Sequence, residues 1–529
     1  MRRLPSLALA ALLAASLQAQ PTPQQTKPNP AKPDLTLDGT VEGKQNHTHF
    51  EIPFTVPVNT HRISVDLSYT GKDQKTALNL GVADPERFRG NSGGNKSHFT
   101  ISETDATPSY LPGAILPGKW KLLISVPNIR ATETSHYHVE IHFNSAQEDQ
   151  SFTLHPLEDN KRWYRGDLHM HTAHSDGSCL SQTGKSVPCP LFFTVQSAAT
   201  RGLDFIAITE HNTDSHYNDE RELQPYFDKL LLIPGREMTT FWGHFNIYGI
   251  TQFIDYRAVS PDDTLSEPKN GHYDINSILR EVRAKGGIAS INHADSPGGE
   301  ICMGCAWEPP ASPQSSIDMS LFTGVEVING GRIFLSSADF WDAQIAREIG
   351  QGATLTAIAG SDNHNAPSEP GHPGSIAWPT TVVEADNLSV PAILEGIRHG
   401  RVFIDLTASH NKIVDISARD TSARDTANNQ QAIMGGTLRA NAGDTIAVTI
   451  HLTGCLRSQV HIFLDGKENS AIPTLPAPTP TQESAQGREE KVSFEWKTDG
   501  HPHWLRAEVR DSNSSLMLVS NPIYIHPAH

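Results

Sequence analysis

Residues 163–177 read WYRGDLHMHTAHSDG, and the expected fold is organised around this stretch. Its first six residues predict a strand, which delivers His169 and His171 and then opens into a polar loop with His174 and Asp176. Side chains at positions i and i+2 of an extended chain point to the same side, so the two imidazoles can share one metal ion. Taken alone, this pair fits a histidine-rich surface strand equally well.

Polar groups recur where later predicted strands end. From about residue 151 to residue 406, apolar strands alternate with amphipathic helices, which is typical of an α/β barrel or a doubly wound sheet. The strand-end groups are Glu210-His211, Arg236-Glu237, Asn292-His293 and Asp362-Asn363-His364, and His244 opens another strand. Because barrel enzymes carry their chemistry at the carboxyl ends of the strands, we expect these side chains to converge on one face.

Length and charge restrict the partners. The chain has 529 residues, too many for one core, and a formal net charge of −17. Its negative field repels polyanions, so long nucleic acid and anionic membranes are disfavoured. A small-molecule ester substrate remains compatible, since bound metal ions reverse the local charge. The oligomeric state does not follow from the sequence.

The N-terminus predicts export. In residues 1–19, Arg2 and Arg3 precede an apolar run that ends in small residues near Ala19, as in a secretory signal peptide. The run is short for a transmembrane helix, so we expect no membrane span after cleavage and a periplasmic or extracellular protein. Residues 20–34, rich in Pro and Gln, predict a disordered linker.

Two β modules are expected to flank the α/β part at residues 151–408. Residues 35–150 and 409–529 show short alternating runs separated by Gly, Asn, Asp and Pro. This pattern predicts an N-terminal β-sandwich and a C-terminal immunoglobulin-like β-sandwich. Neither module shows a cluster of metal-ligand residues.

Five cysteines suit an oxidising compartment. We expect loop-stapling disulfides rather than a zinc site at Cys302-Met-Gly-Cys305, because no second CxxC accompanies it. Residues 177–190 and 296–313 each follow ligand candidates and hold two cysteines, so we hypothesise a stapled rim around the substrate pocket. The spacing does not fix the pairing. Cys455 is expected to be a buried, small apolar residue.

The motif series resembles that of a known superfamily. DLHMHT, SDG, ITEHN, GRE, GHFNIYG, INH and GSDNH, in this order over about half of the chain, resemble the PHP (polymerase and histidinol phosphatase) motifs. The exported, sandwich-flanked layout resembles the CehA/McbA-type branch of metallohydrolases. The resemblance implies a distorted (β/α)7 barrel with two to three divalent metal ions.

The resemblance also implies nine ligands. The first ion would be held by His169, His171, Glu237 and Asp362, the second by Glu237, His244 and His293, and the third by Asp176, His211 and His364. Many family members have an aspartate in the second motif where this chain has Glu210, which leaves the role of Glu210 open between an orienting residue and a substrate contact.

This ligand set predicts hydrolysis. Mixed imidazole and carboxylate ligands suit Zn, Mn or Fe better than Mg or Ca. A bridged pair of ions acidifies a shared water, so attack by a bridging hydroxide is expected. His174 and Glu210, beside ligands, are candidate proton donors to the leaving group. Arg236 and Arg332 could neutralise a phosphate, with an exposed or ion-paired arginine as the competing interpretation.

Three functions follow from these residues. The leading hypothesis is an exported metal-dependent hydrolase that acts as a phosphoesterase. The first alternative is a carboxylic ester or carbamate hydrolase on the same cluster, because selectivity would depend on rim residues. The second alternative is a non-catalytic binding or adhesion protein with structural metals. The open His/Asp/Glu set argues against the last, since structural zinc sites are closed and often rich in cysteine.

Overall fold

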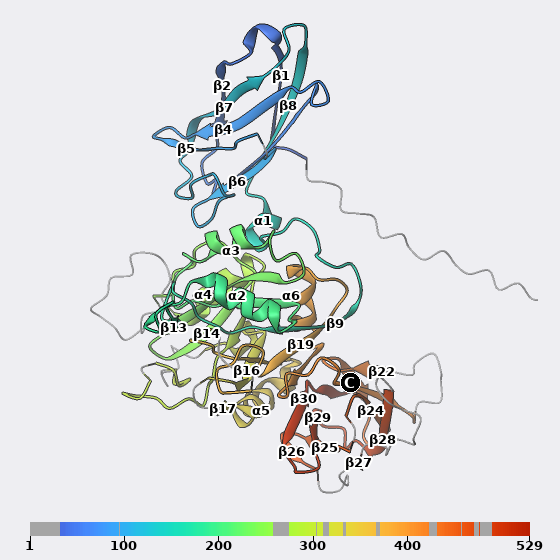
Figure 1. Cartoon of the computed structure of the whole chain (residues 1–529). Coiled ribbons are helices and arrows are strands. Elements are labelled where there is room, and N and C mark those ends of the chain that lie inside the picture. The colour runs from blue at the N-terminus through green and yellow to red at the C-terminus, as the bar shows by residue number, and fades with distance from the viewer. Residues whose placement is uncertain are drawn as a thin grey trace, which may run out of the picture.

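The fold is described by a computed structural model of mixed α/β type, rich in strands. It describes residues 32–94, 96–257, 274–302, 304–309, 317–331, 335–366, 371–422, 431–455, 457–469, 475–476 and 489–528. The predicted signal peptide and most of the predicted linker lie outside these residues. Within them, no helix has the length and apolar character needed to cross a membrane. Figure 1 shows N-terminal sheets at one end, a mixed central part, and C-terminal sheets at the other end.

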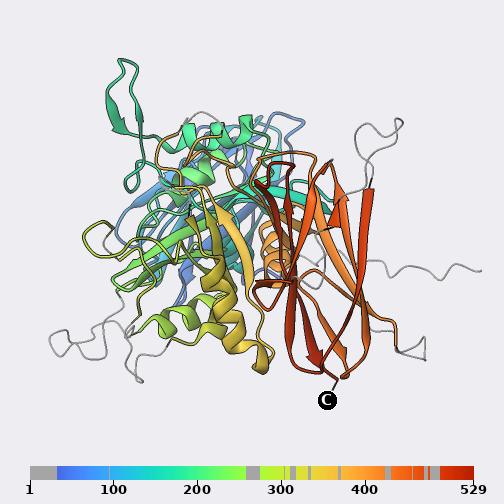
Figure 2. The same cartoon turned by 90° about the horizontal axis from the view of Figure 1, so that it is seen from below.

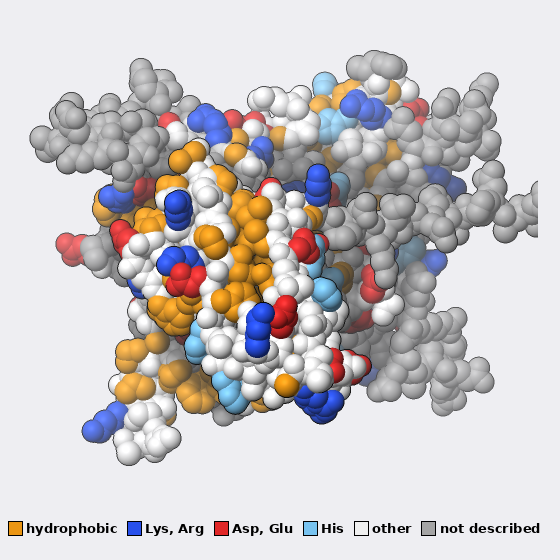
Figure 3. All heavy atoms as spheres, turned by 90° about the horizontal axis from the view of Figure 1, so that it is seen from above, with side chains coloured by type: hydrophobic (Ala, Val, Ile, Leu, Met, Phe, Trp, Pro, Cys, Tyr) orange, Lys and Arg blue, Asp and Glu red, His pale blue; other side chains and the backbone are white. Residues whose placement is uncertain are grey.

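Two antiparallel four-stranded sheets form the N-terminal part. One contains β1 (Leu35–Glu42), β8 (Thr134–Phe143), β3 (Arg62–Tyr69) and β6 (His98–Ser102); the other contains β2 (His49–Val56), β7 (Gly118–Asn128), β4 (Ala77–Ala83) and β5 (Phe88–Asn91). Alternate apolar side chains of both sheets share one core around the fully buried Trp120. On the face seen in Figure 3, basic and acidic side chains are interspersed around a strip of hydrophobic ones.

A buried ionic network joins these sheets to the central part. The fully buried Arg62 donates hydrogen bonds to Asp105 and Asp149, both at 2.7 Å, and to Thr251 at 2.9 Å. Arg221 of helix α3 (Tyr217–Leu223) also pairs with Asp105. Buried charges need such pairing to offset their desolvation, so the contact is a specific one. Helix α1 (Ala146–Gln150) connects the two parts.

The central strands form one mixed ladder. Its order is β19 (Thr380–Ala385), β9 (Arg162–Asp167), β12 (Phe205–Ile208), β13 (Leu231–Thr240), β14 (Gly243–Tyr248), β15 (Ile288–Ile291), β16 (Gly324–Asn329) and β18 (Thr356–Gly360). The pairs β9–β12, β12–β13, β15–β16 and β16–β18 are parallel. Short β17 (Leu335–Ser336) adds to β16.

Helices accompany this ladder. They are α2 (Leu191–Thr200), α3, α4 (Ile275–Ala284), α5 (Ala338–Glu348) and α6 (Val390–Arg398). Two begin at side-chain caps: Asp274 accepts from the Ser277 N–H at 2.7 Å, and Ser389 accepts from the Ala392 N–H at 3.4 Å.

The structure does not show the expected (β/α)7 barrel. β14 follows β13 through a tight hairpin and pairs antiparallel with both β13 and β15, so no crossover helix separates β13 from β14. The end strands β18 and β19 are joined through the Thr381 hydroxyl, which accepts from the Ala359 N–H at 2.8 Å and donates to the Ala359 carbonyl at 2.7 Å. Side-chain contacts of this kind do not close a sheet.

The central ladder continues into the C-terminal part. β20 (Val402–Asp405) pairs with β19 and with β30 (Leu516–Ser520), which leads to β29 (His503–Arg510) and β25 (Gln459–Leu464). β31 (Ile523–Pro527) pairs with β29 and β23 (Thr437–Ala440), and β26 (Lys467–Glu468) and β27 (Leu475–Pro476) pair with β25. The ladder therefore crosses the boundary predicted at residues 408–409, and the predicted domain limits stay predictions.

A second C-terminal sheet packs beside this one, as Figure 2 shows. It contains β22 (Gln431–Ile433), β21 (Ile413–Asp420), β24 (Thr445–Thr453) and β28 (Glu489–Lys497). Cys455 is a free cysteine and is buried in the shared core, as predicted.

Candidate metal centre

The ends of β9 and β18 meet through the backbone. The His171 N–H donates to the Asn363 carbonyl at 2.8 Å, and the Asp362 N–H donates to the His169 carbonyl at 2.9 Å. These bonds align the HxH segment after β9 with the Asp-Asn-His segment after β18. The rings of His169 and His171 are both buried, with centroids 5.2 Å apart.

All nine predicted metal ligands come together. They fall into four overlapping groups. Within each group, the candidate ligand atoms lie within 4.8 Å of one another. One group of four contains the exposed Asp176, and we call it the outer group. It consists of His171, Asp176, His211 and His364. The remaining five residues, which we call the inner group, are His169, Glu237, His244, His293 and Asp362.

Glu237 lies at the middle of the inner group, and its side chain is 1% exposed. Its Oε2 atom lies within 3.3 Å of ring nitrogens of His169, His171 and His211. Its Oε1 atom lies 3.0 Å from His244 Nδ1 and 3.5 Å from His293 Nε2. Each oxygen therefore faces a different set of imidazoles, which is the arrangement of a carboxylate that bridges two cations.

The outer group gathers around one oxygen of Asp176. Its Oδ1 atom lies 3.4 Å from His364 Nε2, 3.8 Å from His211 Nε2 and 4.0 Å from His171 Nδ1. The Asp176 side chain is 56% exposed, in contrast to Glu237. The outer group thus opens to solvent on the Asp176 side.

Unpaired buried nitrogens in both groups show that the ligand candidates suit a cation. His171 Nε2, His244 Nε2 and His293 Nδ1 have no hydrogen-bond partner within the described part of the chain. A buried polar atom without a partner is costly, and a divalent ion satisfies the lone pair of a neutral imidazole. The donor set therefore fits divalent metal ions.

Electrostatics balance the cluster in the absence of metal. Burial alone would keep Glu237 and Asp362 neutral, but the surrounding histidines outweigh it and hold the pKa of both carboxyls well below the usual range. Burial opposes a charge on His169, yet Glu326, Asp362 and Glu237 raise its pKa well above the usual value. The buried carboxylates and the surrounding histidines therefore stabilise each other's charged forms.

Two histidines of the outer group, His171 and His364, have pKa values shifted in opposite directions. Burial, together with the neighbouring His364 and His211, lowers the pKa of His171 to about 3. Burial also opposes a charge on His364, but Asp176 and Asp362 outweigh it and raise its pKa to about 9. His171 is therefore a ready neutral ligand, whereas His364 must lose a proton first.

Glu326 is a functional candidate that the sequence analysis missed. It lies on β16 and is 2% exposed. Its Oε1 atom lies 2.9 Å from His169 Nδ1, and its Oε2 atom accepts from the His293 N–H at 3.0 Å and the Asn329 amide at 3.0 Å. A carboxylate behind a ligand histidine fixes its tautomer and orientation. The available signal was a single acidic residue within the apolar strand GVEVIN.

Glu210 supports the loop of the outer group. It is fully buried and accepts hydrogen bonds from the hydroxyls of Thr172 and Ser175. The Ser175 hydroxyl in turn lies 3.5 Å from His171 Nδ1. This placement is that of an orienting residue, one of the two roles left open for Glu210.

The other two predicted catalytic residues are not brought to the cluster. His174 Nδ1 lies 2.8 Å from the Ser215 hydroxyl, and His174 Nε2 lies 3.1 Å from Asp219, so the ring faces α3. Arg236 precedes Glu237 on β13 and therefore points to the other side of the strand. It is fully buried 3.7 Å from Asp214 and over the ring of Phe253. Arg332 lies outside the described residues.

The loops next to the cluster carry disulfides, in line with the stapled-rim hypothesis. Cys179 is bonded to Cys189, and Cys302 to Cys305. The cysteines are thus used within their own loops and are not part of the metal centre.

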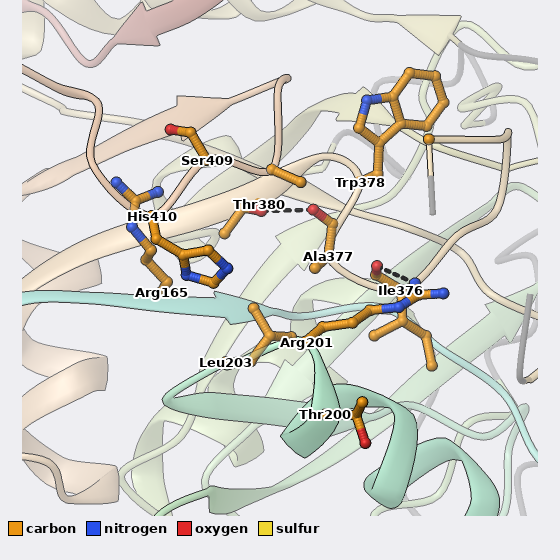
Figure 4. A pocket seen from close by; sticks show the side chains of 12 residues that line it. Arg165, Thr200, Arg201, Leu203, Ile376, Ala377, Trp378, Thr380, Ser409 and His410 are labelled. Carbon is orange, nitrogen blue, oxygen red and sulfur yellow. Dashed lines mark hydrogen bonds between the residues drawn. The ribbon is translucent and has the colours of Figure 1, made fainter. Parts of the chain in front are cut away.

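A separate cavity of about 260 Å³ lies between α2, β9 and the segment after β20 (Figure 4). Arg165 in its wall donates to Asp405 at 3.0 Å and to the Lys412 carbonyl, and Arg201 donates to the Ile376 carbonyl. These arginines hold neighbouring segments together. None of the nine ligand candidates lines this cavity, so it is separate from the metal centre.

Comparisons with known proteins give weak likeness to solved structures. No protein-family model matches the chain, and a comparison with curated proteins finds no match. A solved structure of a two-domain protein containing a predicted PHP-like metal-dependent phosphoesterase, from Bacteroides vulgatus, is 17% identical over 69% of this chain and 96% of that chain, with a TM-score of 0.34. A score of this size does not establish a shared fold.

Proposed function

We propose that this chain is an exported metal-dependent hydrolase of the PHP superfamily, in its CehA/McbA-type branch, that cleaves phosphoesters. The observation that carries the proposal is the position of Glu237, whose two oxygens face separate sets of histidines. A carboxylate placed in this way suits a multinuclear centre. A structural site with one closed ion would not need it.

The nine residues would hold two to three ions of Zn, Mn or Fe. The inner group, together with His171, would hold the bridged pair, and Asp176, His211 and His364 would hold the third ion. Such ions supply Lewis acidity for the scissile bond and acidify a water for attack on it. The substrate would be a small phosphoester that enters on the exposed side of Asp176.

The remaining side chains prepare this site. Glu326 fixes the ring of His169 from behind, and Glu210 orders the loop of Asp176 through Thr172 and Ser175. In its neutral state, His171 has one ring nitrogen whose lone pair is available to a metal ion. These groups orient ligands before substrate arrives, which lowers the reorganisation needed during reaction.

An exposed apolar rim favours a second candidate, a carboxylic ester or carbamate hydrolase. Phe241, at the hairpin that leads to His244, is 88% exposed, and Ile301 is 79% exposed. The segment that follows Ile301 contacts this hairpin: the Glu308 N–H donates a hydrogen bond to the Trp242 carbonyl at 2.9 Å. Exposed large apolar side chains beside a site are typical of surfaces that bind apolar groups.

A side-by-side turnover assay tests both candidates. Mn- or Zn-loaded protein would be given a nitrophenyl phosphomonoester, the bis-nitrophenyl phosphodiester and an aryl carbamate, with His293→Ala as the control. We expect turnover of a phosphoester that the variant loses. Turnover of the carbamate alone would favour the second candidate, and tight metal binding without turnover of any substrate would favour a binding protein.

A further inference from the structure

The outer group differs from the inner group in what holds it in place. Asp176, its only carboxylate, lies in the loop between β9 and the hairpin of β10 (Ser178–Leu180) and β11 (Ser186–Pro188). Figure 2 shows this hairpin projecting from the body of the molecule. Each of its strands has three residues, and a short isolated hairpin has little stability of its own. Another constraint must therefore define the loop.

Backbone hydrogen bonds tie the base of this hairpin to the outer group. The Ser178 N–H donates to the carbonyl of the ligand candidate His364 at 2.7 Å. The Ala173 N–H donates to the Cys189 carbonyl at 2.8 Å, and the Cys189 N–H donates to the Gly177 carbonyl at 3.0 Å. These bonds close a ring of chain around Asp176.

The Cys179–Cys189 disulfide locks the same ring. It joins residues 10 apart, with Cα atoms 4.9 Å from each other. Cys179 is 5% exposed and Cys189 is 1% exposed. They pack in one core cluster with Met170 and Ala366, which flank the ligand segments at His171 and His364. The disulfide is thus positioned directly behind the outer group.

We propose that the Cys179–Cys189 disulfide is a positioning element for the outer metal ion: it is required to hold that ion and is dispensable for the inner ions. The inference rests on the proposed metal centre. The inner residues are fixed by strands and by buried partners such as Glu326 and Asn292, which do not involve the hairpin. The outer group gains its preorganisation from the closed loop, so an open loop weakens that ion alone.

The test compares metal binding by the full chain, by Cys179→Ala/Cys189→Ala, and by Cys302→Ala/Cys305→Ala as the matched disulfide control. Bound Zn or Mn is counted by elemental mass spectrometry, and affinities are measured by chelator competition. We expect the first variant to lose the weakest ion, or to bind it about 10- to 100-fold more weakly, the range for residues that support ligands. The control is expected to keep all ions.

Three results would overturn the inference: a folded first variant with unchanged stoichiometry and affinity, loss of the inner ions instead, or an unmodified chain with only two ions. If circular dichroism shows that the variant is unfolded, the oxidised and phosphine-reduced forms of the unmodified chain replace it, with free thiols counted by mass spectrometry. An unmodified chain that binds no metal would defeat the proposed function itself, whereas equal binding by all forms would defeat only this inference.

Discussion

The inner and outer groups use similar ligands on different supports. The inner side chains Glu237, His169 and His293 are at most 7% exposed; Glu237 lies within β13, and the two histidines directly follow strands of the mixed ladder. In the outer group, Asp176, His211 and His364 are 56%, 27% and 31% exposed and lie on loops. The burial of each group therefore determines how strongly that group depends on a bound cation. Buried nitrogens without partners make the inner half costly to leave empty, whereas water can solvate the outer half.

Removal of the shared carboxylate gives the largest expected effect. In Glu237→Gln, both inner ions lose a ligand, so we expect metal affinity to fall by more than about 100-fold, beyond the range for supporting residues. Turnover should be lost with it. Elemental analysis and the turnover assay measure this, with Glu395→Gln on the surface of α6 as the control. A variant that keeps two tightly bound ions would show that Glu237 does not bridge.

Glu326→Gln tests the support of the inner half. Because the carboxylate lies behind His169 and does not belong to the ligand groups, we expect a drop of about 10- to 100-fold in inner-ion affinity. The outer ion should be unaffected. Chelator competition measures the affinities of the inner and outer ions separately. Equal weakening of both affinities would show that the two groups are not supported independently.

The pH dependence of metal binding separates the halves further. Since the pKa of His364 is raised to about 9 in the metal-free protein, the outer ion must displace a proton below that pH. Its affinity should rise by up to about tenfold per pH unit from pH 7 to about 9 and then level off. In His364→Asn this slope should disappear. A flat profile in the unmodified chain would contradict the charge balance described above.

The same shift affects the stability of the metal-free protein. The folded pKa of His364 lies above the unfolded value of about 6.5, so its charge stabilises the fold fully below that pH. This contribution is lost as the pH rises through about 9. Urea unfolding of metal-free protein at pH 6 and pH 9.5, with His364→Asn as the reference, measures the loss. A difference between the two proteins that does not shrink with rising pH would contradict the assignment.

Chelation gives the smallest expected effect. Ions present at 100 times their Kd stabilise the folded chain by about 2.7 kcal/mol per site, so their removal should lower the melting temperature by a few degrees. Asp176→Asn changes only the outer group, so this variant should keep most of the difference in melting temperature between loaded and metal-free protein. Differential scanning calorimetry with and without chelator checks this. Equal melting curves for loaded and metal-free protein would mean that the buried half does not need a cation.

Ligand candidates such as His169, His293 and Asp362 could be predicted because each stands just after the end of a strand. Apolar strands such as DFIAIT are visible in the sequence, and their ends carry the polar groups. Glu326 escaped prediction because it is a single acidic residue in an apolar strand, and its partner His169 comes from a distant segment. The orientation of His174 was set by Ser215 and Asp219, which no pattern in the sequence relates to it.

The distorted (β/α)7 barrel is the part of the expected fold that the structure does not show. In the sequence, β13 and β14 are consecutive apolar runs. Apolar content does not show whether two such strands pair parallel or antiparallel, so the hairpin between them could not be predicted. The disulfide partners were equally beyond the sequence, because pairing depends on Cα separations such as the 4.9 Å between Cys179 and Cys189.

Anomalous diffraction from crystals grown with Zn or Mn is the most direct test of a bridged inner pair. We expect two anomalous peaks, one on each side of the Glu237 carboxylate, with one near His169 and the other near His244 and His293. A weaker third peak is expected beside Asp176. A single peak that contacts only one Glu237 oxygen, or peaks confined to Asp176 and the solvent-exposed side, would contradict the central claim.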